Sequence, residues 1–107
     1  MSYKLDQDNF QADQKRWSDK TFVGQPLSGK FSHLRREINE LEENPKDIME
    51  YADCYFLLTD IAAKNNVLLS DIHEAAIEKL EINKKRKWGK PNADGSVEHI
   101  KDKEDDS

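Results

Sequence analysis

Apolar residues recur at helical spacing in four segments of the chain: residues 5–18, 31–43, 45–64 and 71–87. Apolar positions three and four residues apart are typical of helices that bury one face. The prolines and glycines fall between these segments or at their ends, and residues 21–30, which hold three of them, predict a loop. The pattern therefore predicts an all-α protein.

The turns between these segments predict how the helices are arranged. Asn44 and Pro45 end the second helix and can begin the third, as N-cap and first-turn proline. So short a turn makes the two helices antiparallel neighbours. The third helix is apolar on almost every face, which indicates a place at the centre of a bundle or between subunits. Ser70 is the expected N-cap of the fourth helix.

Composition narrows the class of protein. A chain of 107 residues with 36% charged residues and no long apolar run predicts one domain and no membrane span. The net charge of −5 argues against general nucleic-acid binding, and the single cysteine and the absence of an apolar N-terminal segment predict a cytoplasmic protein. Within the chain we expect an N-terminal helical segment at residues 1–16, a catalytic domain at residues 17–100 and an acidic disordered tail at residues 101–107.

Four carboxylates on the second and third helices are the strongest chemical signal. Glu37 and Glu40 are three residues apart, as are Glu50 and Asp53, so each pair shares a helix face. Each pair lies at a similar distance from the turn, so all four can converge on one patch. Two carboxylates about 4 Å apart repel by roughly 4 kcal/mol at an effective dielectric of 20. A divalent cation that prefers oxygen ligands, Mg²⁺ first of all, would relieve that repulsion.

Opposite charge is concentrated at the end of the fourth helix and just beyond it. The candidate substrate-binding residues there are Lys79, Asn83, Arg86, Lys87 and Trp88. Basic residues are common at helix C-termini for electrostatic reasons alone, which accounts for Arg86 and Lys87. Lys79 and Asn83 instead interrupt the apolar stripe, and a triphosphate needs such cations beside its metal ion. Trp88 and Trp17 suit either base stacking or core packing.

The acidic pattern, Glu37-x-x-Glu40 followed by Glu50-x-x-Asp53, resembles the metal-binding signature of the MazG-like, all-α nucleoside triphosphate pyrophosphohydrolases. The stretches HLRREINELEENP, EYADCYFLLTDIA and KLEINKKRKWGKPNADGSVEHIKD are similar to the dATP/dGTP diphosphohydrolase subgroup found in phages and bacteria. The resemblance covers residues 17–102. The gap between the two acidic pairs is shorter than in many MazG relatives.

This resemblance implies a four-helix bundle completed by oligomerisation, as a homodimer or homotetramer. It implies Mg²⁺-dependent hydrolysis of a nucleoside triphosphate to the monophosphate and pyrophosphate, with Mn²⁺ as a substitute metal. The four acids would bind the metal and take part in catalysis, and Lys79, Asn83 and Arg86 would contact phosphate or sugar. Two alternatives stay open: a pyrimidine (dUTP or dCTP) pyrophosphatase, and a non-catalytic helical interaction module.

Overall fold

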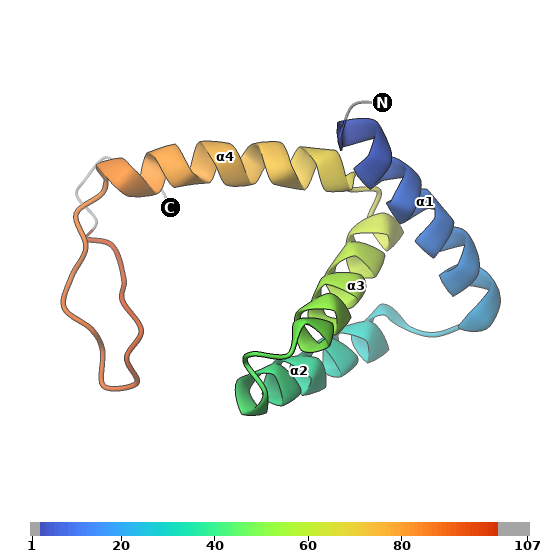
Figure 1. The fold of residues 1–107 in the computed structure, drawn as a ribbon, viewed down its shortest axis with the longest axis horizontal. Coiled ribbons are helices and arrows are strands. Elements are labelled where there is room, and N and C mark those ends of the chain that lie inside the picture. The colour runs from blue at the N-terminus through green and yellow to red at the C-terminus, as the bar shows by residue number, and fades with distance from the viewer. Residues whose placement is uncertain (1–2, 101–107) are drawn as a thin grey trace. The chain divides into compact units, whose positions relative to one another are not determined.

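Residues 3–100 are described by a computed structural model, and they form helices α1 (Tyr3–Thr21), α2 (Leu27–Glu43), α3 (Ile48–Lys64) and α4 (Leu69–Lys85) (Figure 1). The prediction of an all-α fold is confirmed. The chain divides into two compact units, of which the first ends at His73 and the second begins at Glu74, inside α4. The predicted acidic tail lies outside the described residues. The predicted domain boundary between residues 16 and 17 stays a prediction.

The N-terminal ends of α2 and α3 differ from the sequence-based prediction. We expected a loop as far as residue 30, but α2 begins at Leu27, directly after an extended Pro26 with φ −70° and ψ 150°. A proline next to the first turn suits a helix start because its missing N–H is not needed there. The N-cap of α3 is Asp47, whose side chain accepts a 2.9 Å hydrogen bond from the Met49 N–H. The prediction of Asn44 and Pro45 in that role is wrong.

The start of α4 is capped by side chains from α1. Ser70 lies inside α4, so its prediction as the N-cap is wrong. Asp8 accepts hydrogen bonds from the Ser70 backbone N–H at 3.1 Å and from its hydroxyl at 2.8 Å. The side-chain amide oxygen of Gln11 accepts a hydrogen bond from the Leu69 N–H at 2.8 Å. These bonds satisfy the free N–H groups at the start of α4 with side chains that lie about sixty residues earlier in the sequence. Local capping patterns cannot predict such long-range partners.

The core of the first unit joins α1 to the C-terminal half of α3. Its buried apolar side chains are Leu57, Ile61, Ala62, Ala63 and Leu69. Polar contacts reinforce this packing. The buried Gln14 amide donates to the Phe56 carbonyl at 2.5 Å and accepts the Thr59 hydroxyl at 2.6 Å. Each such buried bond stabilises the fold by about 1 kcal/mol net, and losing one partner costs more.

Much of the apolar surface predicted to be buried is exposed in the single chain. The helical spacing of apolar residues predicts that α2 buries one face, but Phe31 and Ile38 on that face are 40% and 51% exposed, so this prediction is wrong for a single chain. On α3, Ile48, Met49 and Tyr51 are also exposed. A two-helix pair covers only the faces turned toward each other. Within the described part of the chain, no helix is both long and apolar enough to cross a membrane.

Candidate metal centre

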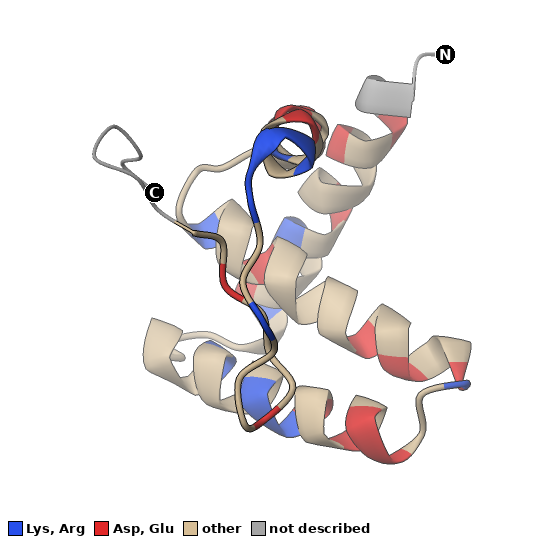
Figure 2. Cartoon of the chain, turned by 90° about the vertical axis from the view of Figure 1, so that its left-hand side faces the viewer, with Lys and Arg blue, Asp and Glu red and all other residues tan. Residues whose placement is uncertain are grey.

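Helices α2 and α3 run side by side in opposite directions, joined by the short turn at residues 44–47 (Figure 1). The predicted antiparallel neighbours are therefore confirmed. Asp and Glu residues gather on both helices close to this turn (Figure 2). A helix pair of this kind holds side chains from both partners at fixed positions, so charges near the turn face one another.

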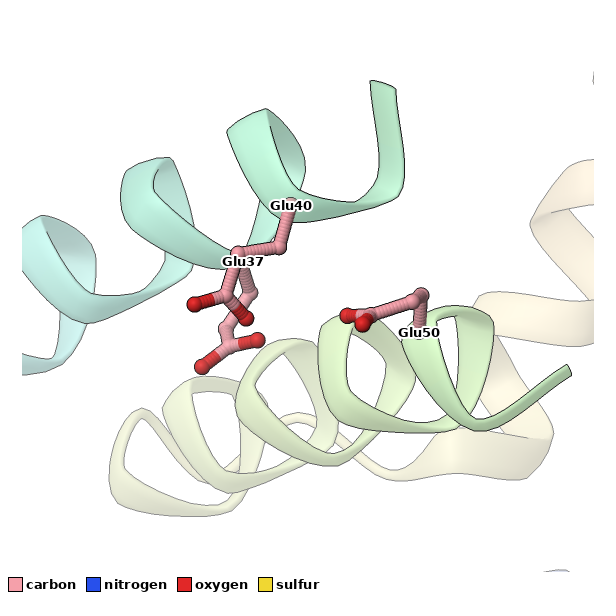
Figure 3. A group of neighbouring side chains, drawn as sticks. All are labelled: Glu37, Glu40 and Glu50. Atoms are coloured by element: carbon pink, nitrogen blue, oxygen red, sulfur yellow. The ribbon is translucent and has the colours of Figure 1, made fainter. Parts of the chain in front are cut away.

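Three of the four predicted acids form a cluster across the helix pair. Glu37 and Glu40 project from α2, and Glu50 projects toward them from α3 (Figure 3). One carboxylate oxygen from each lies within 4.8 Å of those of the other two. Asp53 is not a member of this three-residue group. It lies close enough for its negative charge to help raise the pKa values of Glu40 and Glu50.

Mutual repulsion and desolvation shape the protonation of this cluster. The pKa of Glu40 is raised above its ordinary value, first by a hydrogen bond to Glu37 that exists only when one carboxyl is protonated, and then by the Glu37 charge. Desolvation is the largest cause that raises the pKa of Glu50, followed by the charge of Asp47. Without a counterion, Glu40 and Glu50 therefore hold protons more tightly than isolated glutamates do.

The residues present fit a divalent cation. Among the described residues, Glu37 Oε2 and Glu50 Oε2 are buried side-chain oxygens for which no protein group supplies a hydrogen bond. Buried carboxylate oxygens normally find a donor or a metal ion. An all-oxygen donor set at the edge of a helix pair suits hard cations such as Mg²⁺ and Mn²⁺. Glu37, Glu40 and Glu50 would hold such an ion, with Asp53 beside them.

Two residues beside the cluster, His33 and Cys54, have no clear role in the sequence, and the structure shows what each contacts. His33 is half exposed and its Nε2 lies 3.0 Å from Glu37 Oε1, so it orients that carboxylate. Their spacing of four residues was the available signal. Cys54 is half buried, and burial followed by the nearby carboxylates raises its pKa. Its thiol therefore stays protonated near neutral pH, which disfavours a role as a nucleophile.

A buried ion pair joins α2 to α3, and it was not predicted from the sequence. Lys30 Nζ lies 2.6 Å from Asp60 Oδ2, and the two side chains are only 4% and 2% exposed. The Ser18 hydroxyl of α1 donates to the same Asp60 oxygen at 3.0 Å. Two signals were available. Asp60 sits in an apolar helix, and it is seven residues from Asp53, which places both on one helix face. Lys30 escaped notice because its segment was predicted to be a loop.

The predicted substrate-binding residues belong to the second unit, which is described by itself. There the Arg86 guanidinium donates to the Asn83 side-chain oxygen at 3.2 Å, and the Trp88 indole N–H donates to the Asn83 carbonyl at 3.0 Å. Trp88 also pairs with His99 through an isolated β-bridge and a ring contact at 5.9 Å. Asn83 therefore organises a local cluster around the end of α4. Lys79 and Lys87 are exposed.

The four helices and the facing carboxylates agree with the MazG-like class that the sequence resembles, and comparison with known proteins identifies the family. Residues 10–106 match the family model described as dATP/dGTP pyrophosphohydrolase, and the chain belongs to this family. The family consists of hydrolases that act on phosphoanhydride bonds. The resemblance stated from the sequence is thereby confirmed.

Individual relatives come from phages. The chain is 36% identical over 86 residues to the Eaa protein of Salmonella phage P22, and 33% identical over 87 residues to a dATP/dGTP diphosphohydrolase of Salmonella phage PMBT28. Each alignment covers 80% of this chain but only 27% and 29% of the relatives, so the chain spans less than a third of their length.

A solved structure extends the likeness to the fold. It is the cyanophage S-2L MazG-like pyrophosphohydrolase, bound to dGDP and three catalytic Mn²⁺ ions per active site. The TM-score is 0.69 and the sequence identity 29%, and the match covers 94% of this chain and all of that one. The described helices thus have a MazG-like fold. In that neighbour the active site holds metal ions and a purine nucleotide.

Proposed function

We propose that this chain hydrolyses purine deoxynucleoside triphosphates, dATP and dGTP, to the monophosphate and pyrophosphate in a reaction that depends on Mg²⁺. The observation that carries the proposal is the facing cluster of Glu37, Glu40 and Glu50, whose oxygens lie within 4.8 Å of one another. Family membership supports the reaction, and the dGDP and Mn²⁺ of the structural neighbour support a purine nucleotide and a divalent cation. Mn²⁺ would replace Mg²⁺ because both prefer oxygen ligands.

The acidic residues would have two roles in the metal centre, metal binding and activation of water. Glu37, Glu40, Glu50 and Asp53 would hold the metal, which when bound neutralises phosphate charge and lowers the pKa of water. His33 keeps the Glu37 carboxylate in place through its 3.0 Å contact. Glu40 is exposed, so it would be placed to orient the attacking water and accept its proton.

The residues predicted to bind substrate would supply the positive charge that a triphosphate needs. Lys79 and Arg86 would stabilise the charge that develops on the departing pyrophosphate, and Lys87 would add to the same field. Asn83 already bonds Arg86 and receives the Trp88 N–H, so it would position both. Trp88 offers a half-exposed aromatic ring to a sugar or base.

Self-association is part of the proposal. The exposed apolar side chains of α2 and α3, such as Ile38, Ile48 and Met49, are covered when copies of this chain assemble as a homodimer or homotetramer. The substrate is a free nucleotide, so the proposed function puts the enzyme in the cytoplasm, and it requires neither a nucleic acid nor a membrane partner.

The test is pyrophosphate release from a panel of dNTPs and NTPs, with Mg²⁺, with Mn²⁺ and with EDTA. We expect metal-dependent release that favours dATP and dGTP. Glu50→Gln and Asp53→Asn should lower turnover by about 100-fold or more, the usual scale for losing one charge-stabilising group in an active site. Glu42→Gln is the matched control, since it removes an exposed α2 carboxylate outside the cluster.

Each other outcome changes the proposal in a defined way. Release that favours dUTP or dCTP would keep the metal centre and replace the substrate. Full turnover by Glu50→Gln at saturating Mg²⁺ would remove the acidic cluster from the mechanism. No release from any nucleotide by the folded protein would favour a helical interaction module instead.

A further inference from the structure

The buried ion pair and the candidate metal centre lie along the same contact between α2 and α3, within the first unit of the chain. Lys30 comes seven residues before Glu37 on α2, and Asp60 comes seven residues after Asp53 on α3. Seven residues are about two helical turns, so on each helix the two side chains share a face and lie about 10 Å apart. All four residues line one cavity. A single register, the position of α2 along α3, therefore places both the ion pair and the acids.

The two ends of this helix contact are held by different means. Near the metal centre, the short turn at residues 44–47 joins α2 directly to α3. At the other end the two helices are held by side-chain contacts. There Lys30 Nζ donates to Asp60 Oδ2 at 2.6 Å, and the Ser18 hydroxyl of α1 donates to the same oxygen at 3.0 Å. The ion pair thus ties the end of α2 that lies farthest from the turn to α3.

Lys30 is fixed from several sides. Its ammonium also donates to the Ser18 hydroxyl at 3.2 Å and lies 5.1 Å from the centre of the Phe22 ring. Lys30, Asp60 and Ser18 are all buried. If α2 slid or rotated against α3, both charges would lose their partner without gaining water, which is costly. The ion pair therefore favours one register strongly over its neighbours.

Stability alone does not account for this pair. Asp60 Oδ1 is a buried oxygen that accepts no hydrogen bond from the described residues. Apolar side chains of similar volume often replace a buried ion pair without loss of stability, because removing two charges from water is costly. The best attested benefit of buried polar groups is that they select one register between helices. Lys30 and Asp60 are placed to have that role between α2 and α3.

We propose that Lys30 and Asp60 are positioning residues of the metal centre, and that they fix the register in which Glu37 and Glu40 face Glu50. This inference rests on the proposed function, because it gives the pair a part in the same site. The pair acts through the two helices and supplies no ligand to the metal. Without it, α2 is fixed to α3 by the turn at one end only. The carboxylate oxygens, now within 4.8 Å of one another, would then be held less closely and bind a cation more weakly.

The experiment measures Mn²⁺ binding to the nucleotide-free protein, through the loss of the electron paramagnetic resonance signal of free Mn²⁺ during a titration. Lys30→Met/Asp60→Leu removes both buried charges and replaces them with apolar side chains, an exchange that folded proteins often tolerate. We expect its Kd for Mn²⁺ to be about 10-fold or more above that of the wild type, as when groups that orient metal ligands are lost.

Thr59→Val is the matched control. Thr59 is fully buried and adjacent to Asp60, but its hydroxyl donates to the Gln14 side chain at 2.6 Å and so ties α3 to α1 instead of α2. The variant should lower the melting temperature, while its Kd for Mn²⁺ stays within about 2-fold of the wild-type value. If the Kd instead rises in both variants in proportion to the loss of melting temperature, the pair has only a structural role and the proposal is overturned.

A second variant keeps the test decisive should the double variant not fold. Ser18→Ala removes the hydroxyl that donates to Asp60 and accepts from Lys30, and it leaves the ion pair itself in place. A hydrogen bond to a charged group is lost, so we expect the Kd for Mn²⁺ to rise by about 3-fold or more. An unchanged Kd in the folded double variant would overturn the proposal. So would an unchanged Kd in Ser18→Ala if the double variant does not fold.

Failure of the proposed function is read separately, because Mn²⁺ binding is measured without nucleotide or turnover. A wild type that binds Mn²⁺ more tightly than the double variant but releases no pyrophosphate would support the positioning role and refute the hydrolysis. Pyrophosphate release together with equal Kd values would refute the positioning role and leave the hydrolysis intact. A wild type that binds no Mn²⁺ would also refute the positioning role, and the release assay would still decide the hydrolysis.

Discussion

The buried pair of Lys30 and Asp60 leads to a quantitative prediction about stability. At a separation of 2.6 Å their attraction is about 6 kcal/mol at an effective dielectric of 20, but the cost of removing both charges from water offsets much of it. Lys30→Met keeps most of the side-chain volume and removes the ammonium. It leaves the Asp60 carboxylate buried with the Ser18 hydroxyl as its remaining donor among the described residues. We expect the free energy of unfolding to fall by about 3–5 kcal/mol.

The assay is urea denaturation of the metal-free protein, followed by circular dichroism at one fixed protein concentration. The slope of the transition should be unchanged while its midpoint falls. In a thermal melt the loss corresponds to about 12 °C or more for a domain of this size. The matched control is Lys15→Met, which breaks the exposed Lys15–Asp19 pair on α1. A surface pair of this kind contributes about 0.5 kcal/mol.

Asp60→Leu completes a double-mutant cycle. Each single variant leaves one buried charge without its partner, whereas Lys30→Met/Asp60→Leu removes both charges. The double variant should therefore be more stable than either single variant. The coupling energy should exceed about 2 kcal/mol. The reasoning is refuted if Lys30→Met costs no more than Lys15→Met. It is equally refuted if the double variant loses the sum of the two single effects.

Two further predictions concern charge and capping. Folding raises the pKa of Glu50 above 4.5, so its contribution to stability is present below that pH and lost as pH rises through the raised pKa. Glu50→Gln should therefore raise the melting temperature in EDTA at pH 7 but not below pH 4, and a lower value at pH 7 would contradict this. Gln11→Leu breaks side-chain bonds to Thr59, Val67 and Leu69, so urea denaturation should show a loss of about 2–4 kcal/mol. A loss below about 1 kcal/mol would show that water replaces these bonds.

The helices were predictable from the sequence, whereas their first residues were not. Periodicity reports which residues share a face, and it located all four helices. Helix starts depend on which side chain reaches the free N–H groups. For α3 that residue is Asp47, two positions after Pro45, where the helix was predicted to begin. For α4 the donors are satisfied by Asp8 and Gln11, which come from another helix. Only the tertiary structure brings them together.

The candidate site was predictable to the same extent. Glu37, Glu40 and Glu50 were found because helical spacing and a short turn suffice to bring them together. Lys30 and Asp60 were not predicted, because Lys30 lay in a predicted loop and Asp60 deep in α3. Only the tertiary structure shows that the two side chains form an ion pair. The exposed stripe of α2 has a related cause. Apolar spacing identifies a face that will be covered, but not whether the cover comes from the same chain.

One face of α3 connects the metal centre to the buried ion pair. Asp53 and Asp60 are seven residues apart, so they share this face at a separation of about 10 Å along the helix. The Lys30–Asp60 pair therefore holds α3 against α2 about two turns from the acidic cluster. Because Glu37 and Glu40 come from α2 and Glu50 from α3, a shift of one helix against the other would change the distances between these carboxylates. The buried ion pair would then affect metal binding as well as stability.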